Sequence, residues 1–325
     1  MPLTTALTQR LAIEHPVLLA PMDLVADARL AASVSAAGGL GILGGGYGDE
    51  TWLRTQLDAL GDSGQRYGVG FITWSLARAP RLLDLVLERR PSAVMLSFGD
   101  ADPFAARAKR AGVQVICQVQ SIEMARAALA AGADILVAQG TEAAGHGATR
   151  GLMSLLPEVL DTVGAGVPVV AAGGIADGRG LAAALLLGAS GVLMGTRFYA
   201  TQEAAGADAA KQRIVRADGD GTVRGMVFDI TRRRQWPAPF TGRCLRNAHT
   251  ERWSGREIEL LHSVDEVARD YEAARAANDF DIAAVIAGEA VGLIHDIVPA
   301  QRVVHDVVAQ AAALLGGATR HLAAR

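Results

Sequence analysis

Short apolar runs bounded by Gly, Pro or Asp recur along the first two thirds of the chain. Continuous runs of Val, Ile, Leu and Ala, without alternation of polar and apolar positions, are typical of parallel strands that are buried on both faces. We therefore predict eight strands, at Val17–Ala20, Leu40–Leu43, Gly68–Ile72, Ala93–Ser97, Val113–Val119, Asp134–Ala138, Val167–Ala172 and Gly191–Met194.

Segments rich in Ala and Leu, and long enough to form helices, separate many of these strands. The clearest lie at Ala28–Ala37, Pro103–Ala111, Ser121–Ala131, Met153–Val163 and Gly178–Leu187. Several are followed by glycine, the residue that most often ends a helix before the next strand. Strands that alternate with helices predict parallel βαβ units, and eight such units predict a closed (β/α)8 barrel, the TIM barrel, rather than an open sheet.

Beyond Tyr199 the chain becomes richer in charge and carries a proline-rich break at residues 236–239. Helical patterns follow at Ser263–Ala277 and Asp281–Ala287, and a last amphipathic one runs from about Pro299 to Leu315. We expect a smaller, mostly helical region over the barrel mouth, with the last helix returning to the barrel. The predicted division is a barrel of residues 1–210 plus 290–325 and a smaller substrate-side domain of residues 211–289.

Composition narrows the class of protein. At 325 residues and 50% hydrophobic, the chain is long enough for one barrel with an appendage. A formal net charge of -3 gives no basic footprint for nucleic acid or an acidic membrane. The two cysteines, Cys117 and Cys244, lack the spacing of a disulfide scaffold or a zinc site.

The sequence also lacks targeting signals of the common kinds. No apolar stretch has the length of a membrane helix, and the N-terminal residues lack the apolar core of a signal peptide. We therefore expect a cytoplasmic enzyme that acts on a small molecule, without a nucleic-acid, membrane or metal partner. The sequence leaves a homodimer open.

Two glycine-containing strand ends predict a phosphate site. The runs at 169–172 and 191–194 stop at Gly173-Gly174 and at Gly195-Thr196. Glycine lets an oxyanion approach the backbone N–H groups, and a following helix adds attraction. Two such loops near the end of a (β/α)8 chain match the phosphate site after strands 7 and 8 of a TIM barrel.

His146 is the most prominent titratable residue at a predicted strand end. It lies between Gly145 and Gly147, which leave the imidazole uncovered, and histidine exchanges protons near neutral pH. From spacing alone, a catalytic histidine and a loop histidine that only hydrogen-bonds to backbone stay equally open. The remaining histidines are better explained as surface or packing residues.

Three further side chains lie at strand ends. The amide of Gln139 offers a donor and an acceptor in one plane, which suits a heteroaromatic ligand. The alternative is that Gln139 only holds its own loop. Met22 either packs against a ring or fills space. Glu142 is either an electrostatic partner of His146 or, as we favour, a group that orients the loop.

The common alternative motifs are missing. No G-x-G-x-x-G follows the first strand, no Walker lysine follows the triple glycine at 44–46, and neither G-x-S-x-G nor H-E-x-x-H occurs. A dinucleotide fold, a P-loop, a serine hydrolase and a zinc protease are therefore disfavoured.

Several segments in this order resemble one known family. They are LLAPM at 18–22, AGGLGILGGG at 37–46, VAQGTEAAGHG at 137–147, PVVAAGGIADGRG at 168–180 and GVLMGTRFYAT at 191–201, with AGEAVGLIHDIVPA at 287–300. Together they are similar to the nitronate monooxygenases, formerly called 2-nitropropane dioxygenases. The glycine motifs occur in many barrels, whereas their order and the Q-G-x-E-A-x-G-H loop are specific.

The resemblance implies FMN at the barrel mouth, with its phosphate at the two glycine loops, and it matches His146 to the catalytic histidine of the family. The residues that we expect to bind the cofactor are Ala20, Pro21, Met22, Gly70, Gln118, Gln139, Ala144, Gly145, Gly173, Gly174, Met194, Gly195 and Thr196.

The chain departs from the family at two places. Members often carry Asn at the end of strand 3, in a GVN sequence, where this chain has Gly70. A polar contact is therefore missing or supplied by Thr73. The usual double glycine before the histidine is here Ala144-Gly145, which could tighten the pocket.

The leading hypothesis is FMN-dependent oxidation of alkyl nitronates or nitroalkanes by O2, giving a carbonyl compound and nitrite. His146 would remove the α-proton of a neutral nitroalkane or, when protonated, stabilise the nitronate. The nearest rivals are NADH-dependent flavin reductases of the enoyl-acyl carrier protein reductase or quinone reductase type. A lyase or isomerase that binds a phosphate ligand is the rival without a redox cofactor.

Overall fold

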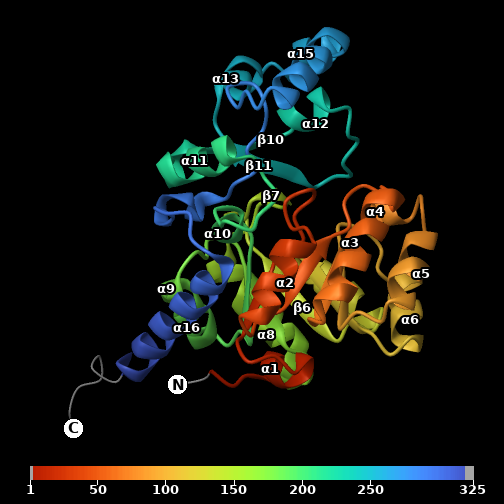
Figure 1. The fold of residues 1–325 in the computed structure, drawn as a ribbon, viewed down its shortest axis with the longest axis vertical. Helices are drawn as coiled ribbons and strands as arrows, with labels where there is room; N and C mark the ends of the chain where they lie inside the picture. The colour runs from red at the N-terminus through yellow and green to blue at the C-terminus, as the bar shows by residue number, and fades with distance from the viewer. Residues whose placement is uncertain (1–2, 319–325) are drawn as a thin grey trace.

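A parallel barrel forms the body of the molecule (Figure 1). The computed structural model describes residues 3–318. Within these residues eight parallel strands lie where the sequence predicts them, with ends shifted by at most two residues. Their bounds are β1 Val17–Leu19, β2 Gly41–Gly44, β3 Tyr67–Ile72, β4 Ala93–Ser97, β5 Gln114–Val119, β6 Ile135–Gln139, β8 Val169–Ala172 and β9 Gly191–Met194.

The order of the strands closes the sheet. It runs β1-β9-β8-β6-β5-β4-β3-β2. A parallel bridge between Leu18 and Leu40 joins the two ends, and Leu19 N donates to Leu40 O (3.0 Å). The prediction of a TIM barrel is therefore confirmed.

Side chains that alternate along each strand fill two layers. Leu18, Ile42 and Met95 point into the barrel, where they form a cluster with Leu7 and Leu11 of α1 (Ala6–Leu11). The intervening strand residues, among them Val17 and Leu19, pack outward against the helices in a second, larger cluster. This two-sided burial explains why the strands carry uninterrupted apolar runs.

The helices around the barrel confirm the predicted segments. Their bounds are α2 Ala28–Ala36, α3 Glu50–Ser63, α4 Thr73–Leu76, α5 Arg81–Glu88, α6 Asp102–Arg110, α7 Ile122–Ala130, α8 Leu152–Val163, α9 Gly178–Leu186 and α10 Thr196–Tyr199. The last described helix, α16 (Ala300–Gly316), packs against α9 and α2 as predicted. A Cβ at Gly178 would lie 2.5 Å from Val307 O, so glycine there lets α9 and α16 approach closely.

A smaller region lies over one end of the barrel (Figure 1). Its helices are α11 Asp208–Arg216, α12 Val227–Thr231, α13 Ala248–Trp253, α14 Glu257–His262 and α15 Val264–Ala276. It also holds strands that the sequence did not predict: β10 (Thr222–Gly225) and β11 (Thr241–Leu245). They form an antiparallel sheet with β7 (Gly145–Gly147), a short strand after β6 that is not part of the barrel sheet. The division at residues 210 and 290 stays a prediction.

One predicted helix is wrong. Residues 281–287 form turns and extended chain instead. Asp281 accepts a hydrogen bond from the Arg213 side chain, and Val285 O accepts one from Leu245 N (2.9 Å), so this segment lies alongside β11. Ala283, Val285 and Ala287 are buried while the residues between them are less so, an alternation with the period of extended chain. Among residues 3–318, no helix combines the length and apolarity needed to cross a membrane.

Candidate active site

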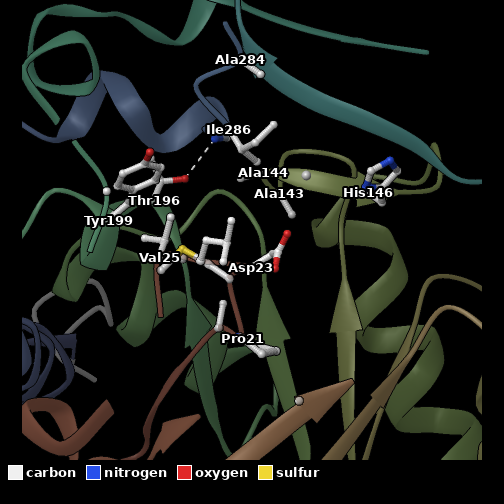
Figure 2. A pocket seen from close by; sticks show the side chains of 18 of the residues that line it. Pro21, Asp23, Val25, Ala143, Ala144, His146, Thr196, Tyr199, Ala284 and Ile286 are labelled. Atoms are coloured by element: carbon white, nitrogen blue, oxygen red, sulfur yellow. Dashed lines mark hydrogen bonds between the residues drawn. The ribbon is translucent and has the colours of Figure 1, made fainter. Parts of the chain in front are cut away.

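A cavity of about 440 Å³ opens where the barrel strands end, beneath the smaller region. Figure 2 shows Thr196 and His146 at opposite sides of the view, with Asp23 and Ala143 between them. The volume lies within the range of about 300 to 1,000 Å³ that is usual for ligand and cofactor sites. The predicted residues that line it are Ala20, Pro21, Met22, Gly70, Gln118, Gln139, Ala144, Gly145, His146, Gly173, Gly174, Gly195 and Thr196.

Met194 does not line the cavity. Its side chain is 1% exposed and packs in the outer cluster between strands and helices. Neighbouring strand residues point in opposite directions, so Leu193 faces the cavity instead. The structure gives no support to Met194 as a side-chain contact of a cofactor.

The glycines form one side of the cavity, which we call the glycine wall: Gly173, Gly174, Gly195 and Thr196. Gly173 and Gly174 have φ of +105° and +71°, in the left-handed region where other residues are strained. Gly288 N donates to Thr196 Oγ1 (3.0 Å) at the edge of this wall. The wall is bare backbone over most of its surface, so it fits the phosphate of a cofactor such as FMN.

The surroundings of Gly70, in β3, explain why the chain lacks the Asn that is common in the family at this position. A Cβ there would lie 2.3 Å from Pro21 Cβ, so the position of Pro21 leaves no room for the Asn that is common in the family. Thr73 does not replace its polar contact at the cavity, because it is 1% exposed and absent from the lining. Its Oγ1 has no hydrogen-bond partner among the described residues.

His146 lies on β7, where backbone pairing with Gly242 of β11 fixes its position. Its Nε2 lies 2.9 Å from Asp229 Oδ2 and 3.0 Å from Oδ1. Asp229 comes from α12 and is 5% exposed. A buried carboxylate facing Nε2 makes that nitrogen the N–H donor of the neutral ring, which leaves Nδ1 as the proton acceptor.

Aromatic side chains hold the imidazole in place. The ring of Trp236 stacks on it with centroids 3.4 Å apart and planes 6° from parallel. Phe98 approaches its edge, with a centroid distance of 6.5 Å. No hydrogen bond from a described residue reaches Nδ1, so that nitrogen is available to a substrate.

The residues around the histidine loop have structural roles. Glu142 accepts from Leu152 N at 3.0 and 3.2 Å, at the start of α8, which supports the loop-orienting role that we favoured. Gln139 Nε2 donates to His146 O (3.0 Å), and its Oε1 accepts from Gln120 Nε2 (2.7 Å). Gln139 therefore holds its own loop while it lines the cavity.

Arg224 of β10 ties this loop to the smaller region. Its guanidinium donates to the carbonyl oxygens of Thr141 (2.9 Å), Ala143 (3.1 Å) and Gly147 (3.3 Å). Burial, with Arg243 nearby, lowers the pKa of Arg224 to about 10. The group stays charged at neutral pH and binds several carbonyls at once, so it fixes the course of the loop.

Sequence reasoning missed the partners of His146. Asp229, Trp236 and Arg224 are distant from it in the chain, and no local spacing marks them. Only the proline-rich break after Trp236 drew attention to that segment. His249, which we expected to be a surface or packing residue, is buried and pairs with Thr231 Oγ1 (2.8 Å), whereas His321 lies outside the described residues.

Comparison with known proteins decides the family. The sequence profile described as "Nitronate monooxygenase" matches residues 4–62 and 65–310. The chain belongs to the nitronate monooxygenase family. It is therefore an oxidoreductase, and membership of this family indicates a flavin cofactor.

The names of individual relatives include the family's own activity and a second one. The nitronate monooxygenase npaC of Metarhizium robertsii is 38% identical over 94% of this chain and 93% of its own. A Mycobacterium tuberculosis protein named (3aS,4S,5R,7aS)-5-hydroxy-7a-methyl-1-oxo-octahydro-1H-indene-4-carboxyl-CoA dehydrogenase is 41% identical over 69% of this chain. That match spans 63% of the relative, less than two thirds of its length.

Among solved structures, FabK from Thermotoga maritima superposes with a TM-score of 0.88 at 31% identity. The match covers 98% of this chain and 100% of FabK, so it includes the smaller region as well as the barrel. FabK therefore shares the whole architecture seen here.

Proposed function

We propose that this member of the family is an FMN-dependent nitronate monooxygenase, which oxidises alkyl nitronates and nitroalkanes with O2 to carbonyl compounds and nitrite. The observation that carries the proposal is the pair of His146 and Asp229 at the edge of a cavity that is also lined by bare glycine backbone. Whole-length similarity to a protein named nitronate monooxygenase supports it.

The residues present fit FMN. Gly173, Gly174, Gly195 and Thr196 would hold the phosphate, and Pro21, Met22, Gln118 and Gln139 would lie against the ring system. The chemistry that FMN supplies when bound is acceptance of electrons from the substrate carbon and their transfer to O2.

The protein's own contribution to a neutral nitroalkane is proton removal. Nε2–H of His146 donates to Asp229, which leaves Nδ1 as the proton acceptor of a side chain that lines the cavity. Nδ1 takes the α-proton, the C–H electron pair enters the C=N bond of the nitronate, and the negative charge of Asp229 stabilises the imidazolium that results. A nitronate needs no such step, because its proton is already gone.

A second candidate is an NADH-dependent flavin reductase or a dehydrogenase of a larger thioester. The relative named as a CoA dehydrogenase favours it. So do Arg232 and Arg275, which line the cavity together with Asp23. Guanidinium groups at a cavity suit a phosphate-bearing ligand.

One set of measurements separates the two. The purified protein is loaded with FMN, and nitrite release from ethyl nitronate in air is compared with flavin bleaching by NADH without O2. The proposal predicts fast nitrite release and slow bleaching. Rapid bleaching without nitrite would establish the reductase instead, and failure to retain FMN would contradict both.

A further inference from the structure

Tyr47 is a cavity residue that the mechanism above does not use. It lies in the loop between β2 and α3, flanked by Gly46 and Gly48, whose φ values are +58° and +108°. Ser75 Oγ donates to Tyr47 O (3.1 Å) and anchors its backbone. The side chain lines the cavity.

The ring of Tyr47 is held on several sides. The Arg234 guanidinium carbon lies 4.2 Å from the ring centroid, in a cation–π contact. Trp74 and Trp236 lie with their centroids at 6.0 and 6.3 Å. A tyrosine with so many fixed neighbours presents its hydroxyl in one place.

The hydroxyl has one partner and an unused proton. It accepts a hydrogen bond from Trp236 Nε1 (3.1 Å). No residue within 3–318 accepts a hydrogen bond from its O–H. Burial raises the pKa of Tyr47 above its usual value, so the group is a donor at neutral pH.

Trp236 connects this donor to the proposed base. The face of its indole stacks on His146, while its N–H, at the ring edge, binds the Tyr47 oxygen. Since both contacts are made by one rigid ring, the spacing between the imidazole and the hydroxyl is fixed. A proton acceptor and a hydrogen-bond donor are therefore held together at the same side of the cavity.

We propose that Tyr47 is a catalytic residue that donates a hydrogen bond to a nitro oxygen of the substrate while His146 removes the α-proton. This inference rests on the proposed function. As the C–H bond breaks and its electron pair moves into C=N, negative charge collects on the nitro oxygens. A fixed O–H at that oxygen stabilises the nitronate more than the neutral nitroalkane.

The test is Tyr47→Phe in the FMN-loaded enzyme, with Tyr67→Phe as the matched control. Tyr67 lies at the start of β3, away from the cavity lining, and its hydroxyl donates weakly to Arg89 O (3.5 Å). Nitrate serves as the probe, because it is planar and carries negative charge on oxygen. It does not react. Calorimetry gives its dissociation constant.

We expect Tyr47→Phe to weaken nitrate binding roughly tenfold, the effect of losing one hydrogen bond to a charged group. The KM for ethyl nitronate should rise similarly, and kcat/KM for nitroethane should fall roughly 10²-fold. The Tyr67→Phe enzyme should match the wild type. A fall in kcat with unchanged nitrate binding and unchanged KM would overturn the proposal, since Tyr47 would then act only by holding Trp236.

The two proposals can fail separately. If the wild type oxidises neither nitro compound but binds nitrate through Tyr47, the oxygen-binding role stands and the nitronate activity falls. If nitro compounds are oxidised equally well by wild type and Tyr47→Phe, the activity stands and the role of Tyr47 is refuted. Absence of nitrate binding in the wild type also refutes it.

Discussion

The two sides of the cavity are built differently. The glycine wall is backbone, supplied by the ends of two neighbouring barrel strands. A second part of the lining, which we call the histidine wall, consists of His146, Trp236 and Tyr47, with Asp229 bound to His146 Nε2. Asp229 and Trp236 come from the smaller region. The first wall suits a constant cofactor group, whereas the second gathers side chains that can change with the substrate.

The largest effect is expected at the glycine wall, from Gly174→Val. With φ of +71°, this position strains any branched residue, although a Cβ would meet only ordinary contacts, the nearest at 3.5 Å. We expect nearly complete loss of bound FMN, measured by absorbance after gel filtration. Gly64→Val is the control, because its φ is +66° and nothing lies near its Cβ. If both variants keep FMN, the glycine wall does not hold the cofactor.

A smaller effect is expected at the histidine wall, from Asp229→Asn. The amide keeps the shape but removes the charge that fixes the tautomer and stabilises the imidazolium. We expect kcat/KM for neutral nitroethane to fall roughly 10²-fold, with FMN content unchanged. Asp265→Asn, at an exposed ion pair with Arg233, should have no effect. Equal losses on nitroethane and ethyl nitronate would show that Asp229 only shapes the cavity.

The smallest effect concerns the stability of the region that supplies Asp229. Burial, with Arg252 nearby, lowers the pKa of His249 to about 4 from an ordinary value near 6.5. The unfolded chain therefore takes up a proton at higher pH than the folded one, so stability is full above about pH 6.5 and is lost as the pH falls towards 4. In His249→Gln the loss of stability that comes from protonation of His249 should be absent. Thermal unfolding of both proteins between pH 7 and 4 would measure it. The same dependence of stability on pH in both proteins would contradict the lowered pKa of His249.

The two walls also differ in how far the sequence predicts them. The glycines at 173–174 and 195 follow apolar strands directly, so a local pattern places them at one end of a parallel barrel. His146 was found in the same way. Its partners were not, because Asp229 and Trp236 reach it only through the pairing of β7 with β11, a contact between segments distant in sequence.

The prediction of a helix at 281–287 failed for a related reason. The segment is rich in Ala and Ile, which suits a helix locally, but hydrogen bonding beside β11 fixes it in extended form. Met194 shows the limit within a correctly predicted strand. The strand was placed correctly, yet the last residue before Gly195 that faces the cavity is Leu193 rather than Met194. Tertiary packing, which single-sequence patterns do not report, decides both cases.

The most direct test of the account is the ratio of two activities in His146→Ala. This variant should retain FMN, because His146 is not part of the glycine wall. Activity on neutral nitroethane, followed as nitrite release, should fall by roughly 10²-fold or more, while activity on ethyl nitronate should fall much less, since its proton is already gone. Equal loss on both substrates, or no loss on either, would contradict the role of His146 as the base.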